Sequence, residues 1–187
     1  MTDSNSFQSK TLSDPFDPVF IIQGVPWIIR KVISIASLSM NVTQEVDEVG
    51  TKTLVFTQRV SIAISGLKED KEVHVLDWRE KFHSSVVFGT SSGRSRMVNL
   101  STATGHDGKA LDPLLTKDFL DEGEPGGDNN LYELIVHQTS GWVMEQMWGF
   151  GIVNDERRLI RKMVIRKGDK MAYTRGVYEW MGKEDGQ

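Results

Sequence analysis

The hydrophobic and polar residues in the last third of the chain alternate with a period of two, which predicts β-strands. The predicted strands cover 131–138, 142–149, 157–167 and 170–180. The turns between them contain glycine, serine, asparagine or aspartate and lie at 139–141, 152–155 and 167–169. These residue types tolerate the backbone conformations of tight hairpins. We therefore expect a four-stranded antiparallel meander over 131–180 that buries one face.

The second strand of this meander carries an unusually large apolar face. Because successive side chains point to opposite sides of a sheet, its residues divide into two sets. One set consists of Trp142, Met144, Gln146 and Trp148, and the other of Val143, Glu145 and Met147. A broad apolar face with one amide in it suits the wall of a cavity better than a solvated surface.

The first 100 residues predict a helix-turn-helix followed by more strands. Residues 1–6 are polar and are expected to form a disordered tail, and 7–12 a short strand. Ser13-Asp14-Pro15 is typical of a helix start and Gly24 of a helix end, which indicates helices over 15–23 and 26–35. From Ala36 the period changes to two, and the predicted strands cover 36–46, 51–65, 72–78, 84–88 and 94–100. Their connections are too short for crossover helices, so we expect antiparallel pairing.

An irregular segment, 101–130, interrupts the strands. Its ends have the composition of loops, and 113–121 predicts one short helix. We interpret it as an insertion over one rim of a barrel, with a lid as one possible role. The 187 residues fit one domain. The predicted fold is mainly β: a single antiparallel up-and-down β-barrel with an N-terminal helix-turn-helix and one inserted loop-helix segment.

Composition narrows the classes of function. The formal net charge of -4 argues against a general nucleic-acid-binding role. The chain has no cysteine, which excludes disulfides, thiolate nucleophiles and zinc-thiolate sites. No stretch approaches the roughly 18 apolar residues of a membrane span, and the N-terminus does not resemble a signal peptide, so we expect a cytoplasmic protein. The pattern does not indicate an oligomeric state.

Motifs for cofactors and metals are missing from the sequence. It contains no phosphate-binding glycine loop with lysine, no dinucleotide fingerprint and no histidine pair at metal-ligand spacing, so we expect neither a cofactor nor a metal. Gly89 to Gly93 is rich in glycine and serine and is predicted to be a plain loop. The strand at 157–167 is strongly basic; it could form an outer face that keeps the barrel soluble, or bind an anionic ligand or partner.

Two segments resemble the intracellular lipid-binding proteins, the fatty-acid-binding branch of the calycin barrels. Gln23 to Val32 is similar to the helix-turn-helix of that family, and Tyr173 to Tyr178 to its closing strand. In the family this strand supplies an arginine and a tyrosine to the carboxylate of a fatty acid, which implies such a role for Arg175 and Tyr178. Here one extra residue separates the two, so strict alternation puts them on opposite faces unless Gly176 forms a bulge.

Other features depart from the fatty-acid-binding pattern. The tryptophan of the family's first strand has no counterpart in 7–12, and its second cavity arginine has none in 142–148. The chain also resembles a group of small lipocalin-like proteins of filamentous fungi at 76–79 (Leu-Asp-Trp-Arg), 93–96 (Gly-Arg-Ser-Arg) and 156–158 (Glu-Arg-Arg). Some members are associated with secondary metabolism, which implies a small-molecule role.

Our first hypothesis is a barrel that binds a hydrophobic small molecule of lipid, polyketide or terpenoid type. The apolar wall would consist of Trp142, Met144, Trp148 and Tyr178. The polar residues that orient the ligand would be Gln146, Tyr173 and Arg175. Structural roles compete with this interpretation, because Gln146 could satisfy a backbone group and Arg175 could pair with Glu145 or Glu133 outside the cavity.

The second hypothesis is a cofactor-independent cyclase or isomerase that acts on a reactive secondary-metabolite intermediate in the same cavity. Such a site needs a shape and one or two proton donors or acceptors, so it leaves little trace in a sequence. The acid–base candidates are His83, His137, Glu145 and Tyr178. A protein-interaction module that uses the basic strand is a third and weaker interpretation.

Overall fold

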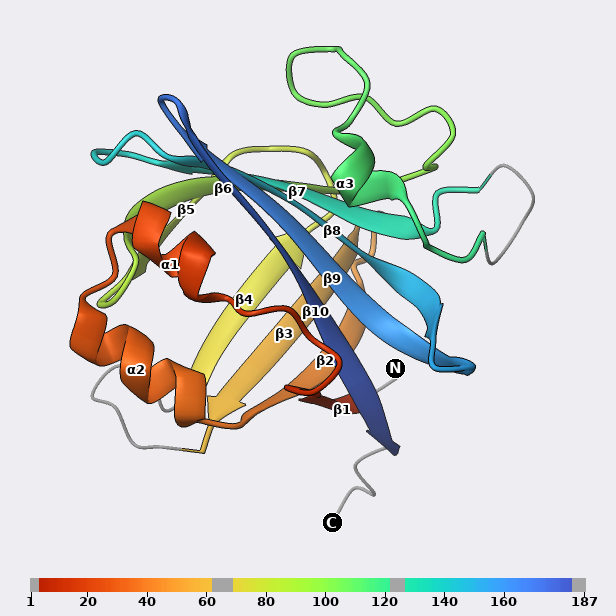
Figure 1. Ribbon diagram of the computed structural model, residues 1–187. Helices are drawn as coiled ribbons and strands as arrows, with labels where there is room; N and C mark the ends of the chain where they lie inside the picture. The colour runs from red at the N-terminus through yellow and green to blue at the C-terminus, as the bar shows by residue number, and fades with distance from the viewer. Residues whose placement is uncertain (1–3, 62–68, 122–126, 183–187) are drawn as a thin grey trace.

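The computed structural model describes residues 4–61, 69–121 and 127–182, which form ten strands and three helices. The strands are β1 (Ser4–Gln8), β2 (Leu38–Val46), β3 (Lys52–Val60), β4 (Glu69–Val75), β5 (Lys81–Ser85), β6 (Gly89–Val98), β7 (Asn130–His137), β8 (Val143–Val153), β9 (Glu156–Lys167) and β10 (Lys170–Gly182). The helices are α1 (Asp17–Gln23), α2 (Trp27–Ile35) and α3 (Pro113–Thr116). Figure 1 shows the strands curled into a half-barrel. The predicted mainly β, antiparallel fold is confirmed.

The ten strands form one antiparallel sheet in the order β4-β3-β2-β1-β10-β9-β8-β7-β6-β5. Strand β1 lies between β2 and β10, so the first strand of the chain pairs with the last. The edges of the sheet are β4 and β5, and the ladders of the described residues do not join them. The half-barrel is compatible with a calycin-like fold, open between these two edge strands.

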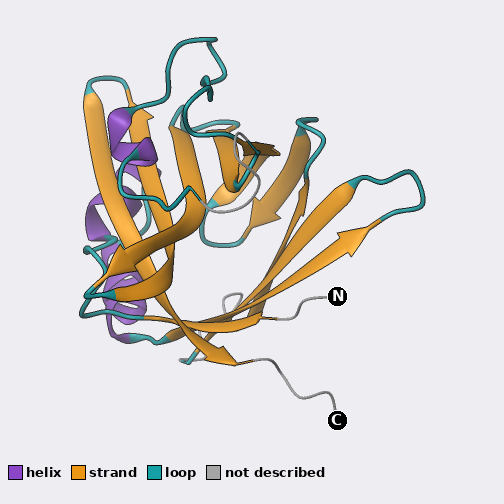
Figure 2. Ribbon diagram, turned by 90° about the vertical axis from the view of Figure 1, so that its right-hand side faces the viewer, coloured by secondary structure: helices purple, strands orange, loops and turns teal. Residues whose placement is uncertain are grey.

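Helices α1 and α2 lie beside the strands on one side of the sheet (Figure 2). Helix α1 contacts β9 and β10 and ends at Gly24, whose φ of 82° is the left-handed conformation that glycine adopts freely. The predicted helix-starting residues have a different partner in the structure. The Asp14 carboxylate accepts a hydrogen bond from the backbone N–H of Arg175, and the Ser13 hydroxyl from that of Val177. They fasten the start of the helical segment to β10.

Alternation along β7 to β10 creates apolar layers on both faces of the sheet. Two clusters lie on the concave inner face; they contain Trp142, Met144, Met163 and Ile165, and Met40, Phe56, Leu131, Trp148 and Tyr178. A third cluster lies on the outer face and contains Val98, Leu111, Leu115, Tyr132, Met147 and Val164. Residues 99–121, which we call the strap, cover this outer cluster. Figure 1 shows the strap and α3 at a different place on the sheet from α1 and α2.

Several element boundaries differ from the sequence prediction. Strand β1 covers Ser4–Gln8, so 4–6 are paired in the sheet instead of forming a tail, and the predicted strand at 7–12 ends at Gln8. Gly89 to Gly93 is the first half of β6, not a loop, because it pairs with β5 and its Ser91 to Gly93 pair also with β7. The last part of the predicted strand at 51–65 lies outside the described residues. No helix in the described part of the chain has the length and apolar character needed to cross a bilayer.

Candidate functional site

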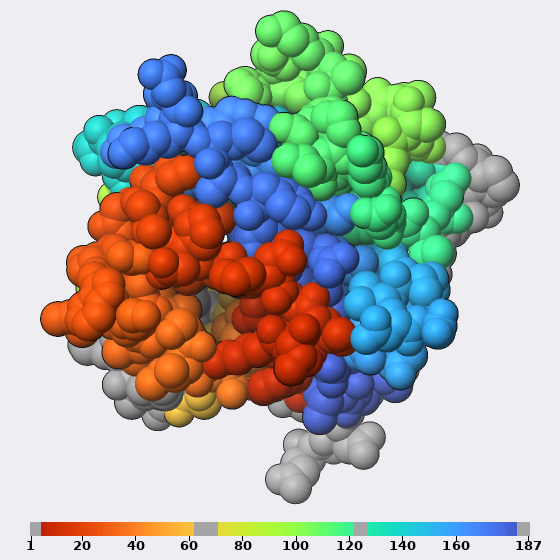
Figure 3. Space-filling view, viewed as in Figure 1, coloured from red at the N-terminus to blue at the C-terminus, as the bar shows by residue number. Residues whose placement is uncertain are grey.

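The concave face of the sheet and the two N-terminal helices enclose a cavity of about 790 Å³. This volume is within the range of small-molecule sites. Its apolar wall includes Phe16, Val19, Phe20, Ile135, Trp142, Met144 and Met163. Figure 3 shows the surface hollowed between the residues that precede α1, in red, and those of α2 and the following segment, in orange. The cavity has an aromatic and thioether wall of the kind that packs against an extended apolar ligand.

Glu133 is the centre of a polar network inside this apolar shell. Its side chain is buried, and both oxygens have partners. Oε2 accepts hydrogen bonds from Gln146 Nε2 at 2.6 Å and from Trp148 Nε1 at 2.9 Å. Oε1 lies 2.5 Å from His74 Nδ1 and accepts a bond of 3.3 Å from the Ser95 hydroxyl. A buried carboxylate with this number of donors is well satisfied.

His74 is held between two carboxylates. Its Nδ1 faces Glu133 on β7, and its Nε2 lies 3.4 Å from Oε2 of Glu72, which is on the same strand as His74. Burial disfavours the charged imidazolium, but Glu133 and Glu72 outweigh this and raise the pKa of His74 to about 10. Burial also acts to raise the pKa of Glu72, yet His74 and Arg161 lower it below its usual range. The two side chains therefore form a charged pair at neutral pH.

Arg161 brings a guanidinium group to the same cavity from β9. Its Nε donates a 2.8 Å hydrogen bond to Gln146 Oε1, and the guanidinium lies 4.7 Å from the centre of the Trp148 ring. Among the described residues no carboxylate is within ion-pair distance of Arg161. The Tyr178 hydroxyl is buried without a hydrogen-bond partner in that same set of residues. Burial raises the pKa of Tyr178, with partial opposition from Arg161, so this hydroxyl stays protonated.

The charge of the cavity lining is opposite in sign to that of the whole chain. Six lysine or arginine side chains line it against four aspartates or glutamates, whereas the chain has 22 against 26. The protonated His74 adds to the positive side. This balance favours a ligand with an electron-rich or anionic group.

The structure divides the sequence-predicted site residues between the two faces of the sheet. Trp142, Met144 and Tyr178 line the cavity, and Gln146 and Trp148 lie on the same inner face, in the network around Glu133. Glu145, Tyr173 and Arg175 lie on the outer face, because they are an odd number of residues away from inner-facing neighbours in regular strands. The ladder between β9 and β10 runs through Gly176 without a bulge. Arg175 and Tyr178 therefore do not meet, and Arg175 bonds the Leu12 carbonyl instead.

The two candidate histidines lie on the strands on either side of β6, and both are opposite Ser91 in its ladders. His83 on edge strand β5 lines the cavity and is exposed. His137 is at the end of β7, where its Nδ1 accepts hydrogen bonds from the backbone N–H groups of Thr139 and Ser140. His137 thus closes the turn between β7 and β8, and its ring packs 5.1 Å from that of Trp142.

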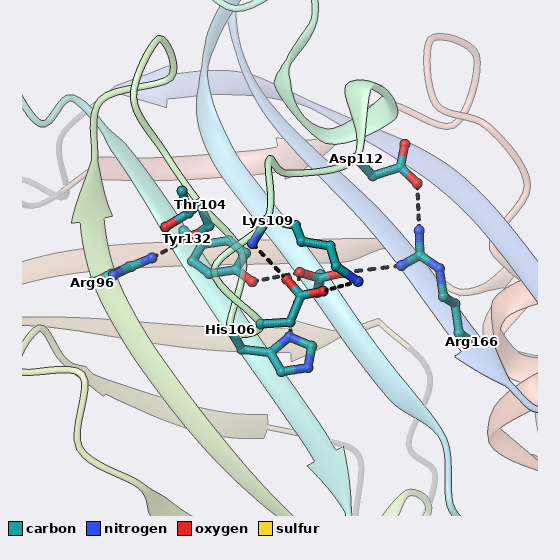
Figure 4. Close-up of polar contacts among 9 residues, drawn as sticks. Arg96, Thr104, His106, Lys109, Asp112, Tyr132 and Arg166 are labelled. Atoms are coloured by element: carbon teal, nitrogen blue, oxygen red, sulfur yellow. Dashed lines mark hydrogen bonds and ion pairs between the residues drawn. The ribbon is translucent and has the colours of Figure 1, made fainter.

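The outer-facing candidate Glu145 belongs to a second polar cluster, shown in Figure 4, which binds the strap to the sheet. Its Oε1 accepts a 2.6 Å hydrogen bond from the Tyr132 hydroxyl, and its Oε2 a 3.1 Å bond from Arg166. Arg166 also contacts Asp112 of the strap at 2.5 Å. The guanidinium of Arg96 lies 4.3 Å from the centre of the Trp78 ring and 5.6 Å from that of Tyr132, and it donates to the Thr104 carbonyl. These contacts have an evident structural role, and none of the residues lines the cavity.

Sequence reasoning missed three residues of the inner network. Alternation could have found Glu133, which shares a face with Leu131 and Ile135, and Arg161, which shares one with Met163 and Ile165. Arg161 was not singled out because it is one of several basic residues in the strand at 157–167, which was interpreted as a whole. His74 stands in a short, mixed strand at the sheet edge, and no local signal distinguishes it.

No family model matches this chain. It is 24% identical over 176 residues to the pericyclase pydY of Acremonium sp, an alignment that covers 94% of this chain and 89% of that protein. It is 25% identical over 173 residues to the probable pericyclase scpY of Mollisia scopiformis, covering 92% of this chain and 86% of the other. The similarity therefore extends over nearly the whole length of each pair.

Proposed function

We propose that this protein is a cofactor-independent cyclase or isomerase that promotes a pericyclic reaction of a conjugated, carbonyl-bearing polyene in its cavity. The observation that carries the proposal is the guanidinium of Arg161, which lies in the cavity, near its apolar wall, without a carboxylate partner among the described residues. The full-length similarity to two proteins named as pericyclases supports the same class of reaction. Binding of a hydrophobic small molecule, our first expectation, is then the first step of turnover.

The apolar wall would supply much of the rate enhancement. In a pericyclic step bonds form and break around one ring of atoms, so the reactant must adopt a single folded conformation. When a cavity holds a flexible polyene in that conformation, the loss of conformational entropy occurs on binding and no longer adds to the barrier of the reaction. The rings of Phe16 and Trp142 and the thioethers of Met144 and Met163 give surfaces for such packing.

Arg161 would supply the electrostatic contribution to the rate enhancement. A hydrogen bond to a carbonyl conjugated with the polyene withdraws electrons from it and strengthens as charge develops on the oxygen. The Nε of Arg161 donates to Gln146, and its terminal N–H groups, which meet no carboxylate among the described residues, are the donors that we assign to the ligand. The protonated Tyr178 hydroxyl lies in the same wall and is a second donor if the side chains shift on binding.

The test uses a metabolite extract of the producing organism in which this gene is disrupted. Purified protein is added, and chromatography with mass spectrometry follows the compounds over time. We expect one accumulated compound to convert to an isomer of identical mass, faster than without protein. Arg161→Gln should slow the conversion by about tenfold or more, since such donors are worth at least that much.

The matched control is Arg94→Gln. Arg94 is a partly exposed arginine of β6 on the outer face, with a 3.8 Å contact to Glu80, and its loss should leave the conversion unchanged. A compound that binds and is released unaltered would contradict the enzymatic proposal and favour a carrier. Equal slowing by both substitutions would remove the role assigned to Arg161.

A further inference from the structure

Arg161 is held at two points by neighbouring strand β8. Gln146 accepts a hydrogen bond from its Nε, and the face of Trp148 supports the guanidinium plane. A free arginine side chain has about 2 kcal/mol of rotamer entropy to lose on ordering. Because these contacts exist before any ligand binds, Arg161 loses much of its rotamer entropy when the protein folds, and less remains to be lost on ligand binding.

Both supports depend on one oxygen atom. Glu133 Oε2 accepts from Gln146 Nε2 at 2.6 Å and from Trp148 Nε1 at 2.9 Å. An amide side chain has a donor end and an acceptor end. The bond to Glu133 takes the donor end of Gln146, so the acceptor end faces Arg161. Glu133 therefore decides which way the amide points.

His74 limits the electrostatic effect of that carboxylate. A bare carboxylate so close to the guanidinium would offset its positive charge. The imidazolium lies 2.5 Å from the other oxygen, Oε1, and neutralises Glu133 as a pair. Glu72, the second carboxylate next to His74, acts on Arg161 from beyond ion-pair distance, so neither carboxylate binds the guanidinium directly.

We propose that Glu133 is a positioning residue for Arg161, acting through Gln146 and Trp148, with His74 as its counter-ion. Four strands contribute: β4 gives His74, β7 Glu133, β8 the two intermediates and β9 Arg161. We call the contacts from Glu133 through Gln146 and Trp148 to Arg161 the relay. Its relevance to catalysis rests on the proposed function, but its geometry can be tested without a substrate.

The test is NMR of the whole protein labelled with 15N, in the variants Glu133→Gln, Gln146→Leu and Ser95→Ala. The Nε–H signal of Arg161 is assigned by its absence in Arg161→Gln. We expect slow exchange with solvent in the wild type. Exchange should be faster by about tenfold or more in Gln146→Leu, which removes the acceptor of the Arg161 Nε–H, and also faster in Glu133→Gln, because a neutral amide accepts the bonds from Gln146 and Trp148 more weakly than a carboxylate. Ser95→Ala is the control, because Ser95 bonds the same carboxylate but is not on the path to Arg161.

The imidazole of His74 gives a second readout. It is faced by Glu133 from β7 and Glu72 from β4, while Arg161 and His83 lie farther away and act on Glu72. In Glu133→Gln its titration should move down toward the ordinary value of about 6.5. Circular dichroism checks that each variant is folded, and Gln146→Leu carries the test if Glu133→Gln does not fold.

The outcomes separate this inference from the proposed function. Unchanged exchange at Arg161 in both Glu133→Gln and Gln146→Leu would overturn the relay, whatever happens to turnover. Faster exchange with unchanged conversion would keep the relay and overturn the catalytic role of Arg161. If both hold, Glu133→Gln lowers kcat by roughly 10- to 100-fold, with a smaller change in KM, as expected for a misplaced group.

Discussion

His74 Nδ1 lies 2.5 Å from Glu133 Oε1, so that an imidazolium and a carboxylate meet at the wall of the cavity. The pair is buried, and removal of one partner would leave the other charge uncompensated. It also links edge strand β4 to β7, which are not neighbours in the sheet. The contact therefore contributes to the curvature of the half-barrel as well as to the chemistry of its interior.

This pair makes stability depend on pH in a defined direction. The pKa of His74 is raised to about 10 in the folded protein, against about 6.5 for an unfolded chain. The stabilisation is fully present below pH 6.5 and is lost as pH rises through 10. We expect the free energy of unfolding to fall over this window by up to about 1.4 kcal/mol per pH unit. Urea unfolding between pH 6 and 10 measures it, and His74→Gln should remove this part of the slope. Parallel curves for the two proteins would contradict the prediction.

Tyr132→Phe should destabilise the protein by about 1–3 kcal/mol, because Glu145 loses a partly buried donor. Burial and the Glu145 carboxylate raise the pKa of Tyr132 far above its usual value, so the hydroxyl donates at every working pH. Urea unfolding at neutral pH gives the change. The control is Tyr173→Phe on the same outer face, where we expect a change within about 0.5 kcal/mol. Equal losses in the two variants would show that the bond to Glu145 is not the cause.

Gly149→Ala and Gly93→Ala should have opposite effects on stability. A Cβ at Gly149 would overlap the Asn130 amide and lie 2.8 Å from Phe119 Cδ1, whereas one at Gly93 would meet its nearest atom at 3.9 Å. The first substitution should cost about 1–3 kcal/mol through overpacking. The second should be neutral or gain up to about 1 kcal/mol, because alanine restricts the unfolded chain. Thermal unfolding of both variants in one buffer decides the matter, and a stable Gly149→Ala variant would contradict this packing.

Lys162→Met should loosen the end of the strap. Lys162 is buried on the outer face, where burial lowers its pKa, and its Nζ donates to the Lys117 carbonyl and lies 3.4 Å from Asp118. Methionine keeps the packing and removes the donor. Hydrogen exchange by mass spectrometry should show faster exchange over 113–120 and little change in β10. Lys167→Met, an exposed lysine of the same strand, is the control; the same response there would rule out a specific anchor.

Local patterns were sufficient to predict much of the fold. Period-two alternation predicted β7 to β10, although these strands bury side chains on both faces, against the cavity and beneath the strap. Glycine with proline predicted the bounds of α1 and α2 closely. Alternation also grouped Trp142 with Met144, Gln146 and Trp148 correctly. It could not predict β1 at Ser4–Gln8, since that strand is specified by its pairing with β2 and β10 at distant positions.

The inner network depends on register between distant strands, and one sequence does not contain that information. Glu133 is opposite Gln146 in the β7–β8 ladder, and Gln146 is opposite Met163, which places Arg161 one inner position farther along β9. His74 approaches from the other edge of the curled sheet. Partnerships of this kind become visible when the curvature of the sheet is known.

The two polar networks, one on each face of the sheet, are built from adjacent residues of the same strands. Tyr132 and Glu145 face the strap, and their chain neighbours Glu133 and Gln146 face the cavity. The same backbone segments therefore position side chains on both faces. A substitution on the outer face that shifts one of these strands would also move the guanidinium of Arg161 on the inner face. Stability and reaction rate should consequently vary together when the outer surface of this wall is altered, so a variant selected for one property would have to be measured for the other.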